Sequence, residues 1–231
     1  MNRIESALIN SAPRRWLQRW YETPWLLHLG GPLPAGARTL EIGCGPGYGT
    51  QLILDRFGAA HVDALDLDPA MINRARRRLA RYDDRVRLHH GDAADLRTTL
   101  GAGDASYDAV FDFAIIHHIP DWRAALVEIA RVLRPGGTFY FDEVTAHALA
   151  RPTYRLLFDH PTHDRFTAEQ FTTACHEVGL DADSRSFTRI RSDYLIGAAR
   201  RACTRAASSA TALKATAPPM SRPHDGRRRL R

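Results

Sequence analysis

The sequence predicts an α/β fold: a three-layer αβα sandwich around a mostly parallel, seven-stranded sheet with an antiparallel edge hairpin strand. Three observations support this prediction. Short β-rich runs alternate with helical periodicity through the middle of the chain, a glycine-rich turn follows the first of these runs, and 44% of the 231 residues are hydrophobic. That share of apolar side chains is sufficient for one sizeable core.

The alternation defines five strands with intervening helices. Each strand and its helix occupy about 20 to 30 residues, which is typical of parallel strands joined by helical crossovers. The strand 137–143 follows the turn sequence RPGG and has the dense apolar character of a buried strand. Strands are expected at 38–43, 60–66, 86–90, 107–114 and 137–143, and helices at 47–57, 69–81, 93–100 and 121–133.

The two flanks of this alternation have different patterns. Residues 3–29 have helical periodicity interrupted at Pro13 and Pro24, so they predict a helical cap. Residues 144–166 are irregular apart from a helical stretch near 146–158, and a span of that length between elements is usually functional or mobile.

The last elements lie before the carboxyl-terminal tail. Thr167, with Gln170 three residues later, predicts a capped helix that ends at Gly179. Strands at 184–190 and 193–199 are expected to form the edge of the sheet. The predicted organisation is therefore a helical cap (1–37), a main domain (38–199) with a substrate lid (144–166), and a tail (200–231).

Most of the positive charge lies in that tail. The whole chain carries a net charge of +6, but nine of its 32 basic residues and only one of its 26 acidic residues lie in 200–231. Residues 1–199 are therefore slightly acidic, which disfavours a nucleic acid as the substrate. The tail has no aromatic residue and is rich in Ala, Ser, Thr and Pro, so we expect it to be disordered.

The cellular compartment is predicted from features that the sequence lacks. We see no secretory signal at the amino terminus, and no apolar run reaches the ~18 residues of a membrane span. The three cysteines are an odd number without CxxC spacing, so we expect free thiols and no metal site. These features predict a cytoplasmic protein, with an oligomeric state that the sequence leaves open.

The strongest motif is LEIGCGPGYGT at 40–50, where a strand ends and a helix begins. Its glycines allow a tight turn and the close approach of a ligand to the backbone. A dinucleotide fingerprint would place glycine where this chain has Tyr48. Glu41, two residues before the first glycine, would repel a pyrophosphate and favour a positively charged cofactor such as S-adenosylmethionine.

An acidic residue also ends each of the next two strands. Asp66 lies 19 residues after Gly47, where a carboxylate can accept both ribose hydroxyls of a nucleoside. Asp92 ends the third strand. Taken singly, Asp66 or Asp68 could instead cap the helix at Pro69, and Asp92 could cap the helix that follows it.

Together these motifs resemble the class I S-adenosylmethionine-dependent methyltransferases, in particular the small-molecule branch, over residues 38–199. The resemblance implies their Rossmann-like fold, S-adenosylmethionine as cofactor and methyl transfer to a small molecule. It also implies that Asp66 binds the ribose, that Asp92 accepts the adenine amine, that the Ala93 amide meets the ring, and that Leu67 and Met71 sandwich it. The residues expected to contact the cofactor are Glu41, Gly43, Cys44, Gly45, Gly47, Asp66, Leu67, Met71, Asp92, Ala93 and Phe113.

Candidate general bases follow the fourth and fifth strands. In the resembled family the histidine directly before Ile or Val is frequent, so His118 is the first candidate and His117 the second. Glu143 and His147 follow the fifth strand and are further candidates. The alternative is that one histidine packs in the turn and bonds to the backbone.

Two motifs that the sequence lacks narrow the range of possible methyl acceptors. Residues 112–115 read Asp-Phe-Ala-Ile where many amino methyltransferases have (D/N)PP(Y/F), and no Pro-Cys nucleophile is present. A small-molecule acceptor remains. The aromatic residues expected to roof its pocket, and so to favour an apolar or aromatic acceptor, are Trp16, Trp20, Tyr21, Trp25, Tyr154, Phe158 and Phe166.

Two other functions remain as alternatives. A nicotinamide-dependent oxidoreductase is disfavoured by Tyr48 and Glu41. A non-catalytic nucleoside-binding module would use the same cleft and recruit partners through the basic tail.

Overall fold

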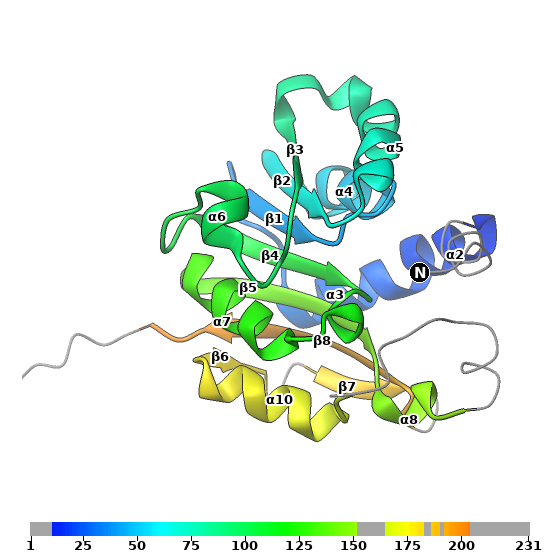
Figure 1. Cartoon of the computed structure of the whole chain (residues 1–231), viewed down its shortest axis with the longest axis vertical. Coiled ribbons are helices and arrows are strands. Elements are labelled where there is room, and N and C mark those ends of the chain that lie inside the picture. The colour runs from blue at the N-terminus through cyan, green and yellow to red at the C-terminus, as the bar shows by residue number, and fades with distance from the viewer. Residues whose placement is uncertain (1–10, 152–164, 183–185, 190–191, 204–231) are drawn as a thin grey trace, which may run out of the picture.

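The structure, a computed structural model, describes residues 11–151, 165–182, 186–189 and 192–203 (Figure 1). Most of the expected lid, including Tyr154 and Phe158, lies outside the described residues, as does the tail from residue 204.

The sheet has the predicted α/β organisation. Seven strands lie side by side in the order β3-β2-β1-β4-β5-β8-β6, and β7 also pairs with β8. Strands β1 to β5 are parallel, whereas β8 is antiparallel to β5, β6 and β7. The strands are β1 (Arg38–Ile42), β2 (His61–Asp66), β3 (Val86–His90), β4 (Tyr107–Phe113), β5 (Leu133–Val144), β6 (Leu180–Asp181), β7 (Ser186–Arg189) and β8 (Tyr194–Arg201).

Helices cover both faces of this sheet, as Figure 1 shows. One apolar cluster packs α3, η2 and α5 against one face, and the other cluster packs α6, α7 and α10 against the opposite face. Successive residues of β5 alternate between them, since Tyr140 lies in the first cluster and Phe139 and Phe141 lie in the second. These helices are α3 (Thr23–Gly30), α4 (Tyr48–Leu52), η2 (Ile53–Phe57), α5 (Pro69–Leu79), α6 (Leu96–Leu100), α7 (Trp122–Val132) and α10 (Ala168–Glu177).

Shorter helical segments join these elements. The capping box predicted at Thr167 and Gln170 is present at the start of α10. The remaining segments are α2 (Ala12–Leu17), η1 (Gln18–Glu22), η3 (Ala80–Arg85), η4 (Ile116–His118) and α8 (Ala146–Leu149).

The carboxyl-terminal side of the sheet differs from the expectation in detail. The antiparallel strand β8 lies inside the sheet rather than at its margin, and it continues to Arg201, two residues beyond the expected domain boundary. The Arg200 guanidinium stabilises this extension because it donates to the carbonyls of Gly136 and Gly30, at 3.0 and 3.1 Å. The two-residue strand β6 was not predicted, since it is too short to show a periodicity.

The amino-terminal cap is one helical run from Ala12 to Gly30 that continues through Pro24. Proline lacks the N–H that an α-helix needs at this point. The run accommodates it with the π-helical turn η1, where the Thr23 hydroxyl donates to the Gln18 carbonyl at 2.8 Å. At the far end, Gly30 lies against the Tyr140 ring, where an added Cβ would come within 2.0 Å of Cε1.

Candidate active site

The glycine-rich turn lies at the carboxyl end of β1 and leads into α4. Gly43, Gly45 and Gly47 adopt positive φ values of 62°, 51° and 86°. Side chains at two positions exclude a Cβ, because it would lie 2.1 Å from Ile115 Cγ1 at Gly43 and 2.0 Å from Glu41 Oε1 at Gly49. A Cβ at Gly45 would meet nothing within 4 Å, so this part of the turn faces open space.

Asp66 joins this turn to the end of β2. One of its carboxylate oxygens accepts from the Gly45 amide and the other from the Asp68 amide, both at 2.8 Å. Burial raises the pKa of Asp66, and these two backbone hydrogen bonds oppose the rise. The side chain keeps 9% of its surface exposed, so the carboxylate is held in place at the rim of the turn.

Glu41 lies beneath the turn rather than at its rim. Its side chain is 1% exposed and accepts a hydrogen bond from the Thr50 hydroxyl of α4. Burial raises the pKa of Glu41 to about 8, with further contributions from the charges of Asp66 and Asp112. The sequence placed Glu41 on an acidic rim, and it missed Thr50, although Thr50 is part of the same motif.

A second acidic cluster lies at the ends of β4 and β5. Glu143 is fully buried; its carboxylate accepts from the Ile116 amide at 2.7 Å, and its Oε2 lies 2.6 Å from His117 Nδ1. Burial raises the pKa of Glu143 to about 7. Asp112 is also fully buried; its Oδ1 accepts from the Ile115 amide at 2.9 Å, while its Oδ2 has no hydrogen-bond partner.

The candidate histidines occupy different environments. His117 is buried and bonded to Glu143, and burial lowers its pKa to about 3, so the imidazole is neutral at pH 7. His118 is half-buried in the same turn, with its ring centroid 4.2 Å from that of His117. His147 belongs to another cluster, because its Nδ1 lies 2.7 Å from Asp193. Sequence spacing did not reveal the pairing of His117 with Glu143, because His117 lies in η4 and Glu143 lies near the end of β5.

The residues expected around the adenine follow β2 and β3. Leu67 is 70% exposed although it is apolar, whereas Met71 and Ala93 are buried. Asp92 is exposed, and its Oδ1 accepts from the Ala94 amide at 2.9 Å in the turn before α6, whereas the N-cap of α6 is Asp95 rather than Asp92. The Gly91 amide bonds to the Asp66 carbonyl at 3.1 Å, so the β3 loop is tied to the β2 end.

Two other expected residues lie close to the glycine turn. Phe113 is half-buried and would be 2.7 Å from a Cβ at Gly49. Cys44 is buried within the turn, and its amide donates to the Leu65 carbonyl at 2.8 Å.

The aromatic roof expected over the acceptor is not assembled by the described residues. Trp16 and Trp20 are exposed, and Trp25 packs against His28 and Phe187. Phe166 packs in the core against Trp122 and Phe171. Apolar periodicity indicated that these residues would be buried, but it could not distinguish a pocket wall from a core.

The residues at this edge fit a positively charged ligand. Glu41, Asp66 and Asp112 are buried acids with raised pKa values, the charges of Asp66 and Asp112 contribute to the rise at Glu41, and within the described residues none of the three forms an ion pair with an arginine or lysine. The open space over Gly45 leaves room for a ligand. A sulfonium or ammonium group would offset this concentration of negative charge.

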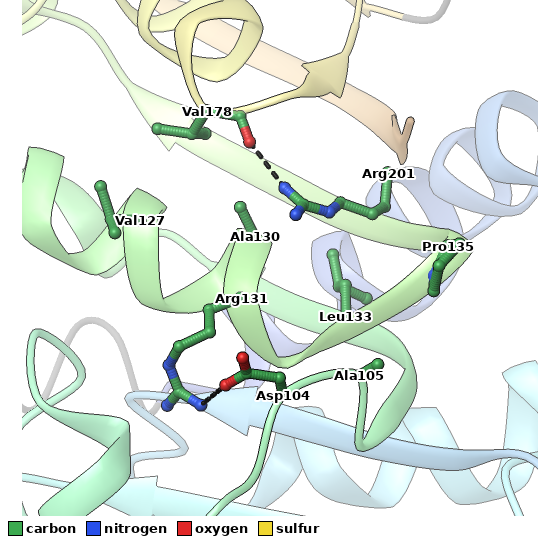
Figure 2. A pocket seen from close by; sticks show the side chains of 9 residues that line it. All are labelled: Asp104, Ala105, Val127, Ala130, Arg131, Leu133, Pro135, Val178 and Arg201. Atoms are coloured by element: carbon green, nitrogen blue, oxygen red, sulfur yellow. Dashed lines mark hydrogen bonds and ion pairs between the residues drawn. The ribbon is translucent and has the colours of Figure 1, made fainter. Parts of the chain in front are cut away.

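A separate hollow of about 420 Å³ lies at the opposite edge of the sheet, near the start of β5 (Figure 2). Arg131 bonds to Asp104 there at 3.0 Å, and Arg201 bonds to the Val178 carbonyl at 2.7 Å. Ligands of open α/β sheets bind at the carboxyl ends of the strands, so this hollow is not the candidate site.

Comparison with known sequences finds a family match in the middle of the chain. Residues 39–137 match the family described as "Methyltransferase domain", which confirms the resemblance over that range. A trans-aconitate 2-methyltransferase of Methylobacterium nodulans is 33% identical over 126 residues, which are 54% of this chain and 45% of that protein. A fatty-acid O-methyltransferase of Mycolicibacterium smegmatis is 37% identical over 134 residues, covering 58% of this chain and 43% of that protein. The chain therefore spans less than half the length of these relatives.

Solved structures agree on the fold. An S-adenosylmethionine-dependent methyltransferase from Mesorhizobium loti superposes with a TM-score of 0.63 at 21% identity, covering 77% of this chain and 96% of that one. The geranyl diphosphate C-methyltransferase of Streptomyces coelicolor, solved with S-adenosyl-L-homocysteine, gives 0.64 at 15% identity and covers 78% of this chain and 79% of that one.

Proposed function

Because residues 39–137 form a methyltransferase domain, we propose that this chain transfers a methyl group from S-adenosylmethionine to a small-molecule acceptor. One observation carries the proposal: the Asp66 carboxylate is held against the Gly45 amide at an open glycine turn, beside the buried acids Glu41 and Asp112. A cationic nucleoside satisfies both parts of this arrangement, since the turn admits the nucleoside and the acids attract the charge.

The contacts of Asp66 leave capacity for a ribose. Each carboxylate oxygen has two acceptor sites, and the Gly45 and Asp68 amides occupy one on each oxygen. The remaining sites would accept the two ribose hydroxyls. Asp92 has its second oxygen for the adenine amine, and the exposed Leu67 would cover the ring.

The remaining expected contacts surround the same turn. Gly43, Gly45 and Gly47 bring the backbone to the ligand, and Cys44, Met71, Ala93 and Phe113 would bound the pocket.

S-adenosylmethionine supplies a methyl group already activated by the positive sulfur to which it is bonded. The protein must then hold the acceptor in line with that group, and such positioning can contribute ~7–11 kcal/mol. The acceptor atom gains the methyl group as the bond from methyl to sulfur breaks. If the acceptor carries a proton, a base must remove it.

We propose His117 as that base, with His118 as the alternative. His117 Nδ1 lies 2.6 Å from Glu143 Oε2, and when Nδ1 carries the proton and donates to Glu143, Nε2 is the nitrogen that can accept a proton. An ionised Glu143 carboxylate would stabilise the imidazolium that forms when Nε2 takes the proton, and this would oppose the burial that lowers the pKa of His117 to about 3. This contact favours His117 over His118, the reverse of the order expected from the sequence.

The names of the relatives are the basis on which we propose a class of methyl acceptor. Their names include trans-aconitate, fatty-acid and malonyl-[acyl-carrier protein] methyltransferases, and each of these acceptors carries a carboxyl group. A carboxylate needs no base, whereas a phenol does.

The slightly acidic charge of residues 1–199 disfavours nucleic acid as a substrate, and the three free thiols support a cytoplasmic location.

Calorimetry with S-adenosylmethionine, S-adenosylhomocysteine and NAD tests the cofactor. We expect heat from the first two ligands, and NAD binding without a response to them would overturn the proposal. Incubation with methyl-labelled S-adenosylmethionine and a panel of fatty acids and phenols then tests catalysis. Label in the organic fraction supports an enzyme, and binding without transfer across cell extracts would support the nucleoside-binding module.

A further inference from the structure

The first part of the amino-terminal helical run, α2 and η1, exposes large apolar side chains and buries polar ones. Trp16 is 64% exposed, Trp20 is 55% exposed and Leu17 is 41% exposed. The residues buried on the opposite side are Gln18, Glu22, Thr23, Leu26 and Gly30. A helix of a soluble domain normally has the reverse arrangement, with apolar residues towards the core.

Buried polar contacts fix this orientation. Both Glu22 carboxylate oxygens lie 2.6 Å from Arg14 Nη1, and the Arg14 guanidinium reaches Asp142 of β5 at 3.8 Å. The Tyr48 hydroxyl, next to the glycine turn, donates to the Arg15 carbonyl at 3.2 Å. The run could turn its tryptophans inward only by breaking a buried ion pair, which is strongly unfavourable.

Arginines surround the exposed rings. The guanidiniums of Arg19 and Arg56 lie over the Trp20 ring, 5.4 and 5.5 Å from its centroid, and neither makes an ion pair within the described residues. Arg78 lies over the Tyr48 ring, and its Nη1 is buried without a hydrogen-bond partner. Burial and the charge of Arg15 both lower the pKa of Arg78, so two like charges lie close together here.

We propose that this patch, formed by Trp16, Leu17, Trp20, Arg15, Arg19, Arg56 and Arg78, binds the surface of a membrane that carries anionic headgroups. Tryptophan prefers the interface between lipid and water, where its ring is buried among acyl chains and its N–H meets polar groups. Guanidiniums bind lipid phosphates, and their attraction adds to that of the apolar side chains. The charge complementarity favours an anionic lipid surface over an uncharged apolar partner.

The attachment would be peripheral. Within the part of the chain that the structure describes, no helix has both the length and the apolar character to cross a bilayer. In Figure 1, α2 lies at the outer side of the molecule, away from the sheet. This inference does not depend on the proposed methyl transfer, because it concerns a different surface.

Cosedimentation of the full chain with vesicles tests the proposal. We expect binding to vesicles of phosphatidylcholine mixed with phosphatidylglycerol, weaker binding to phosphatidylcholine alone, and a decrease with added salt. The double variant Trp16→Ala/Trp20→Ala should reduce the partition coefficient by about tenfold or more. Arg19→Gln/Arg56→Gln should weaken binding to the mixed vesicles and leave binding to phosphatidylcholine unchanged.

Matched substitutions on other surfaces serve as controls. Val127→Ala removes an exposed apolar side chain of α7, and Arg97→Gln removes an exposed arginine of α6; both should bind like the wild type. Equal binding by the double tryptophan variant would overturn the proposal, as would binding that is lost only with Arg227, Arg228 and Arg229 changed to Gln. Self-association that covers the tryptophans, seen as a lipid-independent shift of their fluorescence with protein concentration, would also overturn it.

Discussion

Two clusters of acidic residues lie at the carboxyl edge of the sheet, and they differ in how far their carboxylates are exposed to solvent. At the ends of β1 and β2, Asp66 remains partly exposed and is positioned by two backbone amides. At the ends of β4 and β5, Asp112 and Glu143 are sealed from solvent, and Glu143 contacts His117. A carboxylate at the rim can bind a ligand directly, whereas a sealed one can act only through its charge or through the residue that it holds. The predictions below test this difference.

The largest effect is expected in the sealed cluster. If His117 is the base, His117→Ala should lower kcat by about 10²–10⁴-fold with a protonated acceptor such as a phenol, and KM should change little. Glu143→Gln should lower kcat in the same direction, because it no longer fixes the tautomer of His117. Steady-state kinetics measures both effects.

His147→Ala is the matched control, since His147 is paired with Asp193 in another cluster. It should retain the wild-type kcat. A full effect of His118→Ala with none from His117→Ala would reverse our assignment, and no effect from either would indicate an acceptor that needs no base.

Two glycine substitutions in the turn separate the effect of crowding by a neighbouring side chain from the effect of backbone strain. Gly43→Ala adds a Cβ at φ 62° and 2.1 Å from Ile115, so we expect a loss of about 3 kcal/mol in the free energy of unfolding. Gly45→Ala has φ 51° but meets no atom within 4 Å, so about 1 kcal/mol is expected from strain alone. Urea denaturation measures both values. Equal losses would show that crowding by Ile115 is not important.

At the rim, Asp66→Ala should lose at least ~1.5 kcal/mol of S-adenosylmethionine affinity, the lower end for hydrogen bonds to a charged group. Calorimetry gives the value directly. Asp181→Ala, an acid in β6, is the control and should bind as the wild type does. Unchanged affinity in Asp66→Ala would show that the ribose is held elsewhere.

The last prediction concerns Glu41 and is a pH dependence. Its pKa rises from 4.5 to about 8 in the folded state, so its contribution to stability is complete below pH 4.5 and is lost as the pH rises towards 8. The slope should not exceed about 1.4 kcal/mol per pH unit. A cationic ligand favours the ionised carboxylate, so S-adenosylmethionine affinity should rise with pH up to about 8.

Glu41→Gln keeps an oxygen for the Thr50 hydroxyl and removes the titration. Both the stability and the affinity should then depend less on pH in this variant. Parallel profiles for the variant and the wild type would show that another group is responsible.

Local sequence patterns predicted much of the fold. The strands near 38, 60, 86 and 107 begin within one residue of their expected positions, because alternating burial and glycine turns are encoded in neighbouring residues. Strand β5 begins at Leu133 rather than 137, and β8 extends past 199, because pairing with distant strands extends both. The two-residue strand β6 exists only through its pairing with β8.

The features of the candidate site also divide into those that the sequence predicts and those that only the tertiary structure decides. The sequence by itself determined the glycine turn, the carboxylates at the strand ends and the helical character of the cap, since each depends on spacing within a short segment. Only the tertiary structure decided that Glu41 is buried beneath the turn, that Glu143 holds His117, and that Trp16 and Trp20 face outward. These features depend on contacts between segments far apart in the chain, and burial and charge pairing arise only when those segments meet.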